Sequence, residues 1–134
     1  MDSQPVRKGI VLIAKNDKNE YLLLRHKKNN LWGFISGGLE EGETEAQAAI
    51  REANEEAGLN LTEEQLTDTR EIITFVSSKG PGQQKAFTCT LNNVEINIDG
   101  EEISEYGWFD KETTLKNLEE KPPLVELFNK VVKE

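Results

Sequence analysis

The stretch Gly37–Leu59 reads GGLEEGETEAQAAIREANEEAGL and guides the interpretation of the rest of the chain. A glycine loop leads directly into a segment with helical periodicity. Thr44 and Gln47 have the spacing of a capping box, which predicts that the helix begins just after Thr44. Small apolar residues recur every three or four positions and predict one buried stripe: Ala46, Ala49, Ile50, Ala53 and Ala57. Gly58 suits the left-handed position that ends a helix.

The opposite face of this predicted helix carries three carboxylates, Glu52, Glu55 and Glu56, within an arc of roughly 100°. Like charges at this spacing cost about 0.2–0.5 kcal/mol per pair. The last helical turn also favours cations over carboxylates. Local rules are broken in this way at functional sites, and clustered oxygen ligands suit Mg²⁺ or Mn²⁺. The alternative is a solvated acidic face, which leaves the glycine loop and Arg51 unexplained.

These residues resemble the signature of the Nudix hydrolase family (MutT-like proteins). The signature is a glycine, five residues, a glutamate, seven residues and R-E-U-x-E-E-x-G-U, where U is a bulky aliphatic residue. Gly37, Glu43 and Arg51–Leu59 (REANEEAGL) supply every fixed glycine, glutamate and arginine at its spacing. Ala53 stands at the first U position, which we interpret as a packing adjustment. The match covers 23 of the 134 residues.

The remaining periodicity predicts mixed α and β structure. Two hairpins are expected, from strands 7–15 with 21–25 and 70–77 with 84–91. A short strand is expected at 106–109, and Pro122 opens a last helix. The resemblance adds the layering that the pattern lacks. It implies the α/β (α+β) Nudix fold, an α/β/α sandwich with a central mixed sheet, as a single Nudix hydrolase domain over residues 1–134.

The resemblance implies Mg²⁺- or Mn²⁺-dependent hydrolysis of a nucleoside diphosphate linked to another group. The segments Trp32–Gly37 and Glu40–Thr44 resemble the subgroup that acts on nucleoside triphosphates (NTP or dNTP) and dihydroneopterin triphosphate. Such a reaction releases a monophosphate and pyrophosphate. Hydrolysis of diadenosine polyphosphates or ADP-ribose stays open. An alternative of another class is a Nudix-like module that binds a nucleotide without cleaving it.

Carried over by matching position, the implied metal ligands are Glu52, Glu55, Glu56, the Ser36 backbone carbonyl and an additional Glu102. Glu52 or Glu102 is the expected general base, and the implied catalytic group is Glu52, Glu55, Arg51 and Glu102. Arg51 has the family role of orienting a glutamate, and Glu43 that of tying the loop to the helix. Glu102 is favoured over Glu105 for the extra carboxylate. A solvated acidic turn is the alternative for both.

Substrate contacts are expected from five residues: Arg25, Lys27, Gly37, Gly38 and Phe34. Cationic side chains pair well with phosphate oxygens, although a solvated strand end also explains Arg25 and Lys27. The glycines let the backbone approach the phosphates closely. Phe34 is a candidate to stack on a base, as are Phe75 and Phe87, but aromatic residues in strands also pack in cores. His26 is interpreted as a surface histidine, with a hydrogen bond to substrate as the alternative.

Composition limits the remaining possibilities. The net charge of −9 argues against nucleic-acid binding, which needs a basic surface. No apolar run is long enough to span a bilayer, and the start of the sequence has no signal-peptide pattern. The single Cys89 excludes an internal disulfide and fits a reducing cytoplasm. The sequence does not set the oligomeric state; dimers are common among the proteins it resembles, so a homodimer stays open.

Overall fold

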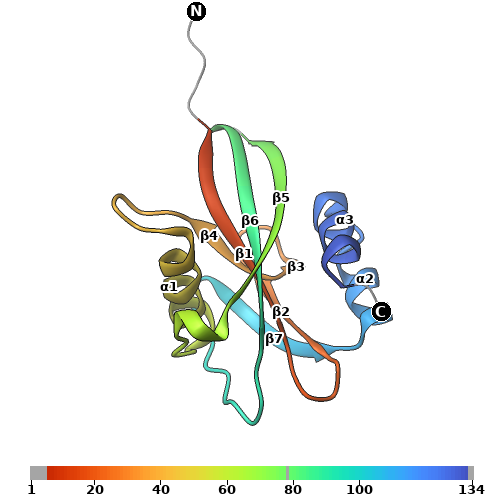
Figure 1. Cartoon of the computed structure of the whole chain (residues 1–134). Coiled ribbons are helices and arrows are strands. Elements are labelled where there is room, and N and C mark those ends of the chain that lie inside the picture. The colour runs from red at the N-terminus through yellow and green to blue at the C-terminus, as the bar shows by residue number, and fades with distance from the viewer. Residues whose placement is uncertain (1–5, 78, 133–134) are drawn as a thin grey trace, which may run out of the picture.

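The computed structural model describes residues 6–77 and 79–132, which form a sheet and several helices around it (Figure 1). The elements in chain order are β1 (Arg7–Lys15), β2 (Tyr21–His26), β3 (Leu31–Gly33), β4 (Ile35–Gly38), α1 (Glu45–Ala57), the 3₁₀ helix η1 (Glu63–Gln65), β5 (Thr67–Ser77), β6 (Gly80–Thr90), β7 (Ile103–Phe109), α2 (Lys111–Asn117) and α3 (Pro122–Val131). Within these residues, no helix combines the length and apolar character needed to cross a bilayer.

The sheet is mixed, as the resemblance implied. Its main path runs β3-β2-β1-β6-β5, while β4 pairs with β1 and β7 pairs with β2. β1 and β6 are parallel, and the other strand pairs are antiparallel. The second expected hairpin is confirmed by β5 and β6, which are longer than the sequence pattern indicated.

The first expected hairpin is only partly right. β1 and β2 have the predicted bounds to within a residue, yet they pair at one register position, Lys15 with Tyr21. Beyond that point β1 pairs with β4 and with β6, whereas β2 pairs with β7 and β3. The hairpin opens because each strand finds its hydrogen-bond partners in segments distant along the chain, which local pattern does not report.

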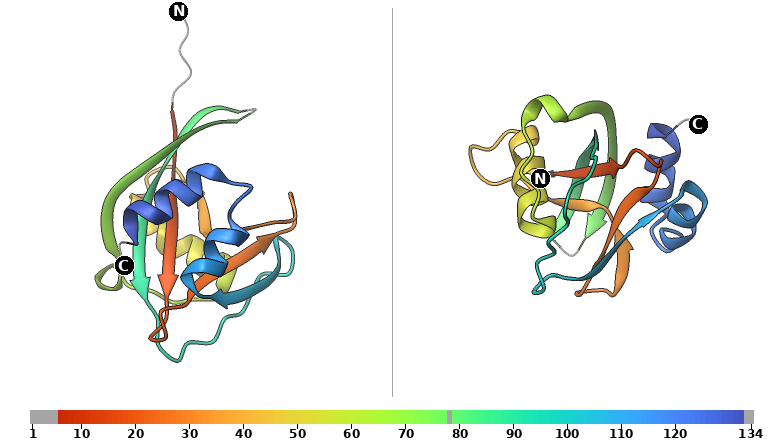
Figure 2. Two further views of the ribbon diagram at one scale, coloured as in Figure 1. Left: turned by 90° about the vertical axis from the view of Figure 1, so that its right-hand side faces the viewer. Right: turned by 90° about the horizontal axis from the view of Figure 1, so that it is seen from below.

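Helices cover both faces of the sheet. In Figure 2 (left), α2 and α3 lie in front of the sheet and α1 lies behind it. Alternating residues of β1 divide between the two layers, with Ile10 and Leu12 in the core beneath α1 and Val11 and Ile13 in the core beneath α2 and α3. These four side chains are at most 1% exposed. The α/β/α layering is therefore confirmed.

Helix α1 has the predicted ends. Thr44 and Gln47 form the capping box, and Gly58 adopts φ 70°, the left-handed conformation that favours glycine. The predicted stripe packs against the sheet, with Ala49, Ala53 and Ala57 fully buried, while Ala46 and Ile50 are partly buried. Ala48 and Glu56 are also buried, so the buried face is wider than the stripe and includes one of the three carboxylates.

Candidate active site

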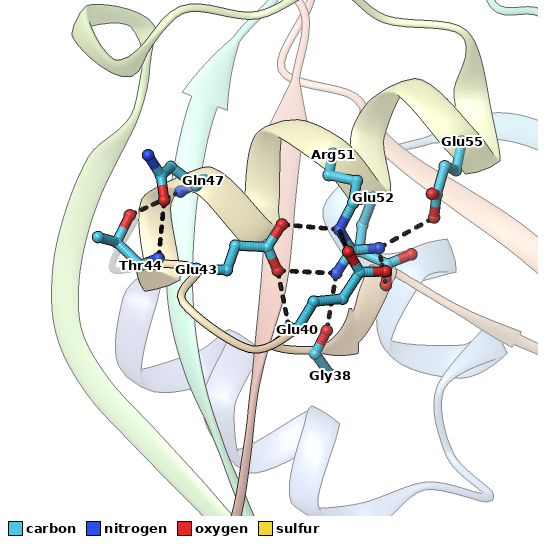
Figure 3. Close-up of polar contacts among 8 residues, drawn as sticks. All are labelled: Gly38, Glu40, Glu43, Thr44, Gln47, Arg51, Glu52 and Glu55. Carbon is cyan, nitrogen blue, oxygen red and sulfur yellow. Dashed lines mark hydrogen bonds and ion pairs between the residues drawn. The ribbon is translucent and has the colours of Figure 1, made fainter.

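Arg51 holds the glycine loop and helix α1 together (Figure 3). Its Nε and Nη2 donate to the two carboxylate oxygens of Glu43, at 2.7 and 3.0 Å. Nη2 also donates to the Gly38 carbonyl at 2.8 Å. Bidentate guanidinium–carboxylate pairs are among the stronger polar contacts in proteins. The predicted structural role of Glu43 is therefore confirmed by its geometry.

The remaining nitrogen of Arg51 faces the acidic cluster. Nη1 donates to Glu52 at 3.2 Å and to Glu55 at 3.0 Å. The hydrogen bond from Arg51 is the main cause that lowers the pKa of Glu43, and Glu43 in turn raises the pKa of Arg51 above its already high value. One permanently charged guanidinium thus fixes the orientation of three carboxylates. The predicted i,i+4 contact between Arg51 and Glu55 is present.

Glu52 packs directly against the strand that carries the glycines. A Cβ atom placed on Gly37 would lie 1.8 Å from a Glu52 carboxylate oxygen, whereas on Gly38 the nearest atom would be the Lys8 carbonyl oxygen at 3.7 Å. Gly37 is therefore required because the carboxylate occupies the space of a side chain. The glycine requirement has a steric cause here, since neither residue has a positive φ.

Alanine substitutions of Gly37 and of Gly38 distinguish the effect of moving the Glu52 side chain from the general effect of changing the glycine loop. Gly37→Ala is expected to displace the Glu52 carboxylate and to lower kcat by at least about tenfold, because misplacing a reacting group by an ångström is costly. Gly38→Ala is the comparison variant, and its loss of kcat is expected to be smaller, since its methyl group would meet only the Lys8 carbonyl oxygen and would leave Glu52 in place. Steady-state kinetics and melting temperatures of both variants check this. Equal losses in the two would contradict it.

Glu56 is the buried member of the acidic cluster. Its side chain is 5% exposed, and one carboxylate oxygen accepts a hydrogen bond from the Ser36 backbone N–H at 3.2 Å. The pKa of Glu56 is raised to about 8, mainly by burial and then by the charge of Glu52. The charges of Glu102 and Glu55 add to this rise, and the Ser36 hydrogen bond opposes it. Burial likewise raises the pKa of Glu52. A bound cation would offset both the cost of burying these carboxylates and the repulsion between them.

The donor set fits a divalent metal ion. Glu52, Glu56 and Glu102 line one cavity, and the Glu102 charge acts on both of the others. Carboxylate oxygens are preferred ligands for Mg²⁺ and Mn²⁺. Among residues 6–77 and 79–132, no three acidic, His or Cys side chains already converge on one point. Arg51 holds Glu52 and Glu55, so an ion would bind with a rearrangement of these side chains.

The cavity has a volume of about 1250 Å³, and groups of both charges line it. Its carboxylates include Glu52, Glu56 and Glu102, and its lysines include Lys27, Lys28 and Lys121. Of the two cations expected to contact phosphate, only Lys27 lines this cavity. Its ammonium group donates to the Gly100 carbonyl, which fixes the β2–β3 loop against the segment before β7.

Arg25 lies elsewhere and is no longer favoured as a phosphate contact. Its Nη1 pairs with Glu105 at 3.0 Å, and its guanidinium lies 5.9 Å from the Trp32 ring centroid. Arg25 has this partner because β2 and β7 are neighbours, which gives it a carboxylate 80 residues away in sequence. The same pair assigns Glu105 to a structural contact, which favours Glu102 as the additional carboxylate of the cavity.

Phe34 is also placed differently from the prediction of base stacking. Its side chain is 1% exposed and stacks on Phe128, with ring centroids 6.0 Å apart. The ring is therefore part of the core beneath α3, as is typical of aromatic residues beside strands. Phe87 is 5% exposed, whereas Phe75 is 38% exposed and lines the cavity. Phe75 is thus the aromatic candidate for a base.

Sequence reasoning missed Lys28 and Lys121 in the cavity lining, and it favoured a surface position for His26 over a hydrogen bond to substrate. Lys121 stands just before Pro122 and has no motif around it. His26 is half-buried, its Nε2 lies 3.4 Å from the Phe34 carbonyl oxygen, and it lines the cavity. The basic run His26–Lys28 was the available signal, but its distance from Lys121 in sequence hid the cluster.

The site lies within a stretch of the chain that matches a known protein family. The family model described as "NUDIX domain" matches residues 5–128 of the chain. The chain belongs to the NUDIX family. The acidic cluster, the glycine strand and the Arg51 contacts described above are thus those of a NUDIX domain.

Two proteins whose names give different activities are similar to this NUDIX chain. It is 39% identical over 74 residues to the dihydroneopterin triphosphate diphosphatase of Escherichia coli (strain K12), a segment covering 54% of this chain and 49% of that protein. The match thus spans about half the length of that relative. The chain is also 34% identical over 113 residues to the bis(5'-nucleosyl)-tetraphosphatase (asymmetrical) of Caenorhabditis elegans, covering 81% of this chain and 80% of that one.

Solved structures agree with the NUDIX assignment. The E. coli dihydroneopterin triphosphate pyrophosphohydrolase superposes with a TM-score of 0.82 at 22% identity, covering 96% of this chain and 98% of that one. The C. elegans Ap4A hydrolase binary complex gives a TM-score of 0.73 at 30% identity, covering 93% and 96%. The first likeness establishes the fold alone. The second joins the fold to a sequence match over nearly the whole of both chains.

Proposed function

We propose that this chain is a Mg²⁺-dependent pyrophosphohydrolase that cleaves a diphosphate linkage in a nucleotide derivative. The favoured substrates are nucleoside triphosphates (NTP or dNTP) and dihydroneopterin triphosphate, with a monophosphate and pyrophosphate as products. One observation carries the proposal. Glu56, which is buried, lines one cavity together with Glu52 and Glu102, and lysines line the same cavity. The cavity therefore has carboxylate ligands for a cation and ammonium groups for phosphate oxygens.

Each group of residues has its own role in the proposed reaction. Glu52, Glu55, Glu56, Glu102 and the Ser36 carbonyl would hold the metal ion. Such an ion neutralises phosphate charge and activates water. Arg51 fixes Glu52 and Glu55 through Nη1. Glu52, whose pKa is raised by burial, is suited to accept the proton of the attacking water, since a base works best with a pKa nearer neutrality. Glu102 is the second candidate base.

A dinucleoside polyphosphate is the second candidate substrate class. The C. elegans tetraphosphatase is similar over 81% of this chain, which is more of the chain than the E. coli diphosphatase match covers. ADP-ribose stays as a further alternative from the sequence. Phe75 is proposed to contact the base and Lys27 a phosphate, with the backbone of Gly37 and Gly38 close to the metal-bound phosphates.

The test is product release across a substrate panel with Mg²⁺ and with Mn²⁺. The panel holds canonical and oxidised nucleoside triphosphates, dihydroneopterin triphosphate, diadenosine tetraphosphate and ADP-ribose. We expect one preferred substrate with turnover that a chelator removes and added Mg²⁺ restores. Chelator-insensitive turnover would contradict the metal assignment. Nucleotide binding without any turnover would identify a non-catalytic binding module instead.

Domain extent, location and partners are part of the same proposal. We propose a single domain over residues 1–134, supported by two apolar layers that share one sheet. A cytoplasmic location fits the single buried thiol of Cys89. The net charge of −9 supports small nucleotides over nucleic acid as ligands. A homodimer remains a prediction, which the molar mass in solution would test.

A further inference from the structure

Lys121 is a partly buried cation in the lining of the cavity. It is the N-cap residue of α3, and its side chain lines the cavity together with Lys28 and His26. The salt bridges within residues 6–77 and 79–132 include no carboxylate paired with Lys121 or Lys28. Burying a cation without an anion is costly. An anionic ligand that enters the cavity would provide the missing partner for Lys121.

Gly33 leaves space for the side chains of Lys121 and His26. A Cβ atom placed on Gly33 would lie 3.0 Å from Lys121 Nζ and 3.6 Å from two atoms of the His26 ring. The ammonium group and the imidazole thus approach the side-chain space that glycine leaves empty. Burial lowers the pKa of Lys121, and the Lys28 charge lowers it further. Burial, Lys121 and Lys28 lower the pKa of His26, so at neutral pH its imidazole is a neutral hydrogen-bonding group beside the two lysines.

This basic cluster (His26, Lys28 and Lys121) lies within reach of the metal-binding carboxylates. Gly33 adjoins the cluster, and Gly37 adjoins the Glu52 carboxylate. Only three residues lie between the two glycines, so their Cα atoms are at most about 14 Å apart. A polyphosphate chain whose scissile linkage lies at the carboxylates can extend over that distance toward the cluster. An ammonium group supplies donors only, so its partner must be an acceptor.

We propose that His26, Lys28 and Lys121 form a subsite for a phosphate group beyond the two that the metal ion holds. The inference rests on the proposed function and narrows it. The substrate then carries three or more phosphates, as in a nucleoside or pterin triphosphate or a dinucleoside tetraphosphate. A substrate with only two phosphates, such as ADP-ribose, leaves the basic cluster without its anion.

The test compares Lys121→Met with Lys116→Met, which removes an exposed lysine from α2 and serves as the control. Inorganic tripolyphosphate and pyrophosphate are titrated calorimetrically in the presence of Mg²⁺. We expect Lys121→Met to weaken tripolyphosphate binding about tenfold or more relative to pyrophosphate, the usual size of a lost charge-assisted contact. Lys121→Arg should recover part of that loss. For the preferred triphosphate substrate, KM should rise more than kcat falls.

Three outcomes would overturn the subsite. The first is unchanged tripolyphosphate affinity in Lys121→Met, which would make Lys121 a purely structural lysine. The second is an equal loss for pyrophosphate, which would place Lys121 on the metal-held diphosphate. The third is a preference of the parent chain for ADP-ribose over every substrate with more phosphates. Because the titration needs no turnover, it also separates failure of the subsite from failure of the proposed hydrolysis. Melting temperatures confirm that each variant is folded.

Discussion

Glu56→Gln is expected to reduce metal-dependent kcat by about 10²–10³-fold while raising the melting temperature of the metal-free protein at pH 8. The loss follows because a neutral amide is a poorer ligand for a hard cation and leaves phosphate charge uncompensated. The gain follows because Glu56 is 5% exposed among like charges, so its ionisation opposes folding. The amide keeps the shape of the side chain and its acceptor oxygen for the Ser36 N–H.

The sign of this stability change depends on pH. Burial raises the pKa of Glu56 from 4.5 to about 8. Below pH 4.5 the carboxyl is protonated in both the folded and the unfolded chain and contributes nothing. Between the two values the unfolded chain loses the proton and the folded chain keeps it, so rising pH destabilises the fold. The advantage of Glu56→Gln should therefore be absent near pH 4 and grow up to about pH 8.

Thermal unfolding in a chelator across this pH range, with kcat in Mg²⁺, measures both effects. Glu64→Gln is the control, since Glu64 is an exposed carboxylate on η1 outside the cavity lining. It should change neither kcat nor the pH dependence. Added Mg²⁺ should reduce the stability advantage of Glu56→Gln, because the bound cation compensates the charge of the parent carboxylate. Full turnover by Glu56→Gln would contradict the assignment of Glu56 as a metal ligand.

Arg51→Met should destabilise the fold by about 2–4 kcal/mol and lower kcat at least tenfold. The side chains of Arg51 and Glu43 are 20% and 13% exposed, so breaking their pair leaves a mostly desolvated carboxylate without its partner. The Gly38 carbonyl also loses its donor, and Glu52 and Glu55 lose the group that orients them. Arg51→Lys should recover little, since an ammonium group cannot make the bidentate contact.

A double-mutant cycle with Glu43→Gln distinguishes the structural contact from the catalytic one. Urea unfolding of Arg51→Met, Glu43→Gln and the double variant should show coupling of about 1 kcal/mol or more, because the two side chains share two hydrogen bonds. In kcat, Glu43→Gln should cost less than Arg51→Met, since Glu43 is not in the cavity lining and its side chain bonds to Glu40 and Arg51, whereas Arg51 bonds directly to Glu52. Additive stabilities would show that Arg51 acts without Glu43.

Helix α1 was predictable because its determinants are local. The capping box of Thr44 with Gln47, the left-handed Gly58 and the alanine stripe depend on residues three or four positions apart. The contact of Arg51 with Glu55 follows the same spacing. The family signature concentrates its chemistry in this one segment, so the carboxylates were identified before any tertiary contact was known.

The remainder of the site depends on contacts between distant segments. Glu56 was expected on the carboxylate face opposite the apolar stripe, and it is buried because the β4 strand lies against that side of α1. Arg25 was expected at the substrate, and β7 provides Glu105 for it instead. Phe34 was a candidate for a base, and α3 provides Phe128. Each difference arises where a second element supplies the partner.

The sequence by itself therefore determined the acidic cluster and the family resemblance, since both are encoded in short-range spacing. The layered α/β fold followed from that resemblance and not from the local pattern. Only the tertiary structure decided which carboxylate is buried, which cations face the cavity and how β1 pairs. The parallel pairing of β1 with β6 and the approach of Lys121 to His26 join segments more than sixty residues apart. Such contacts depend on the packing of the whole chain, which no local pattern of residues records.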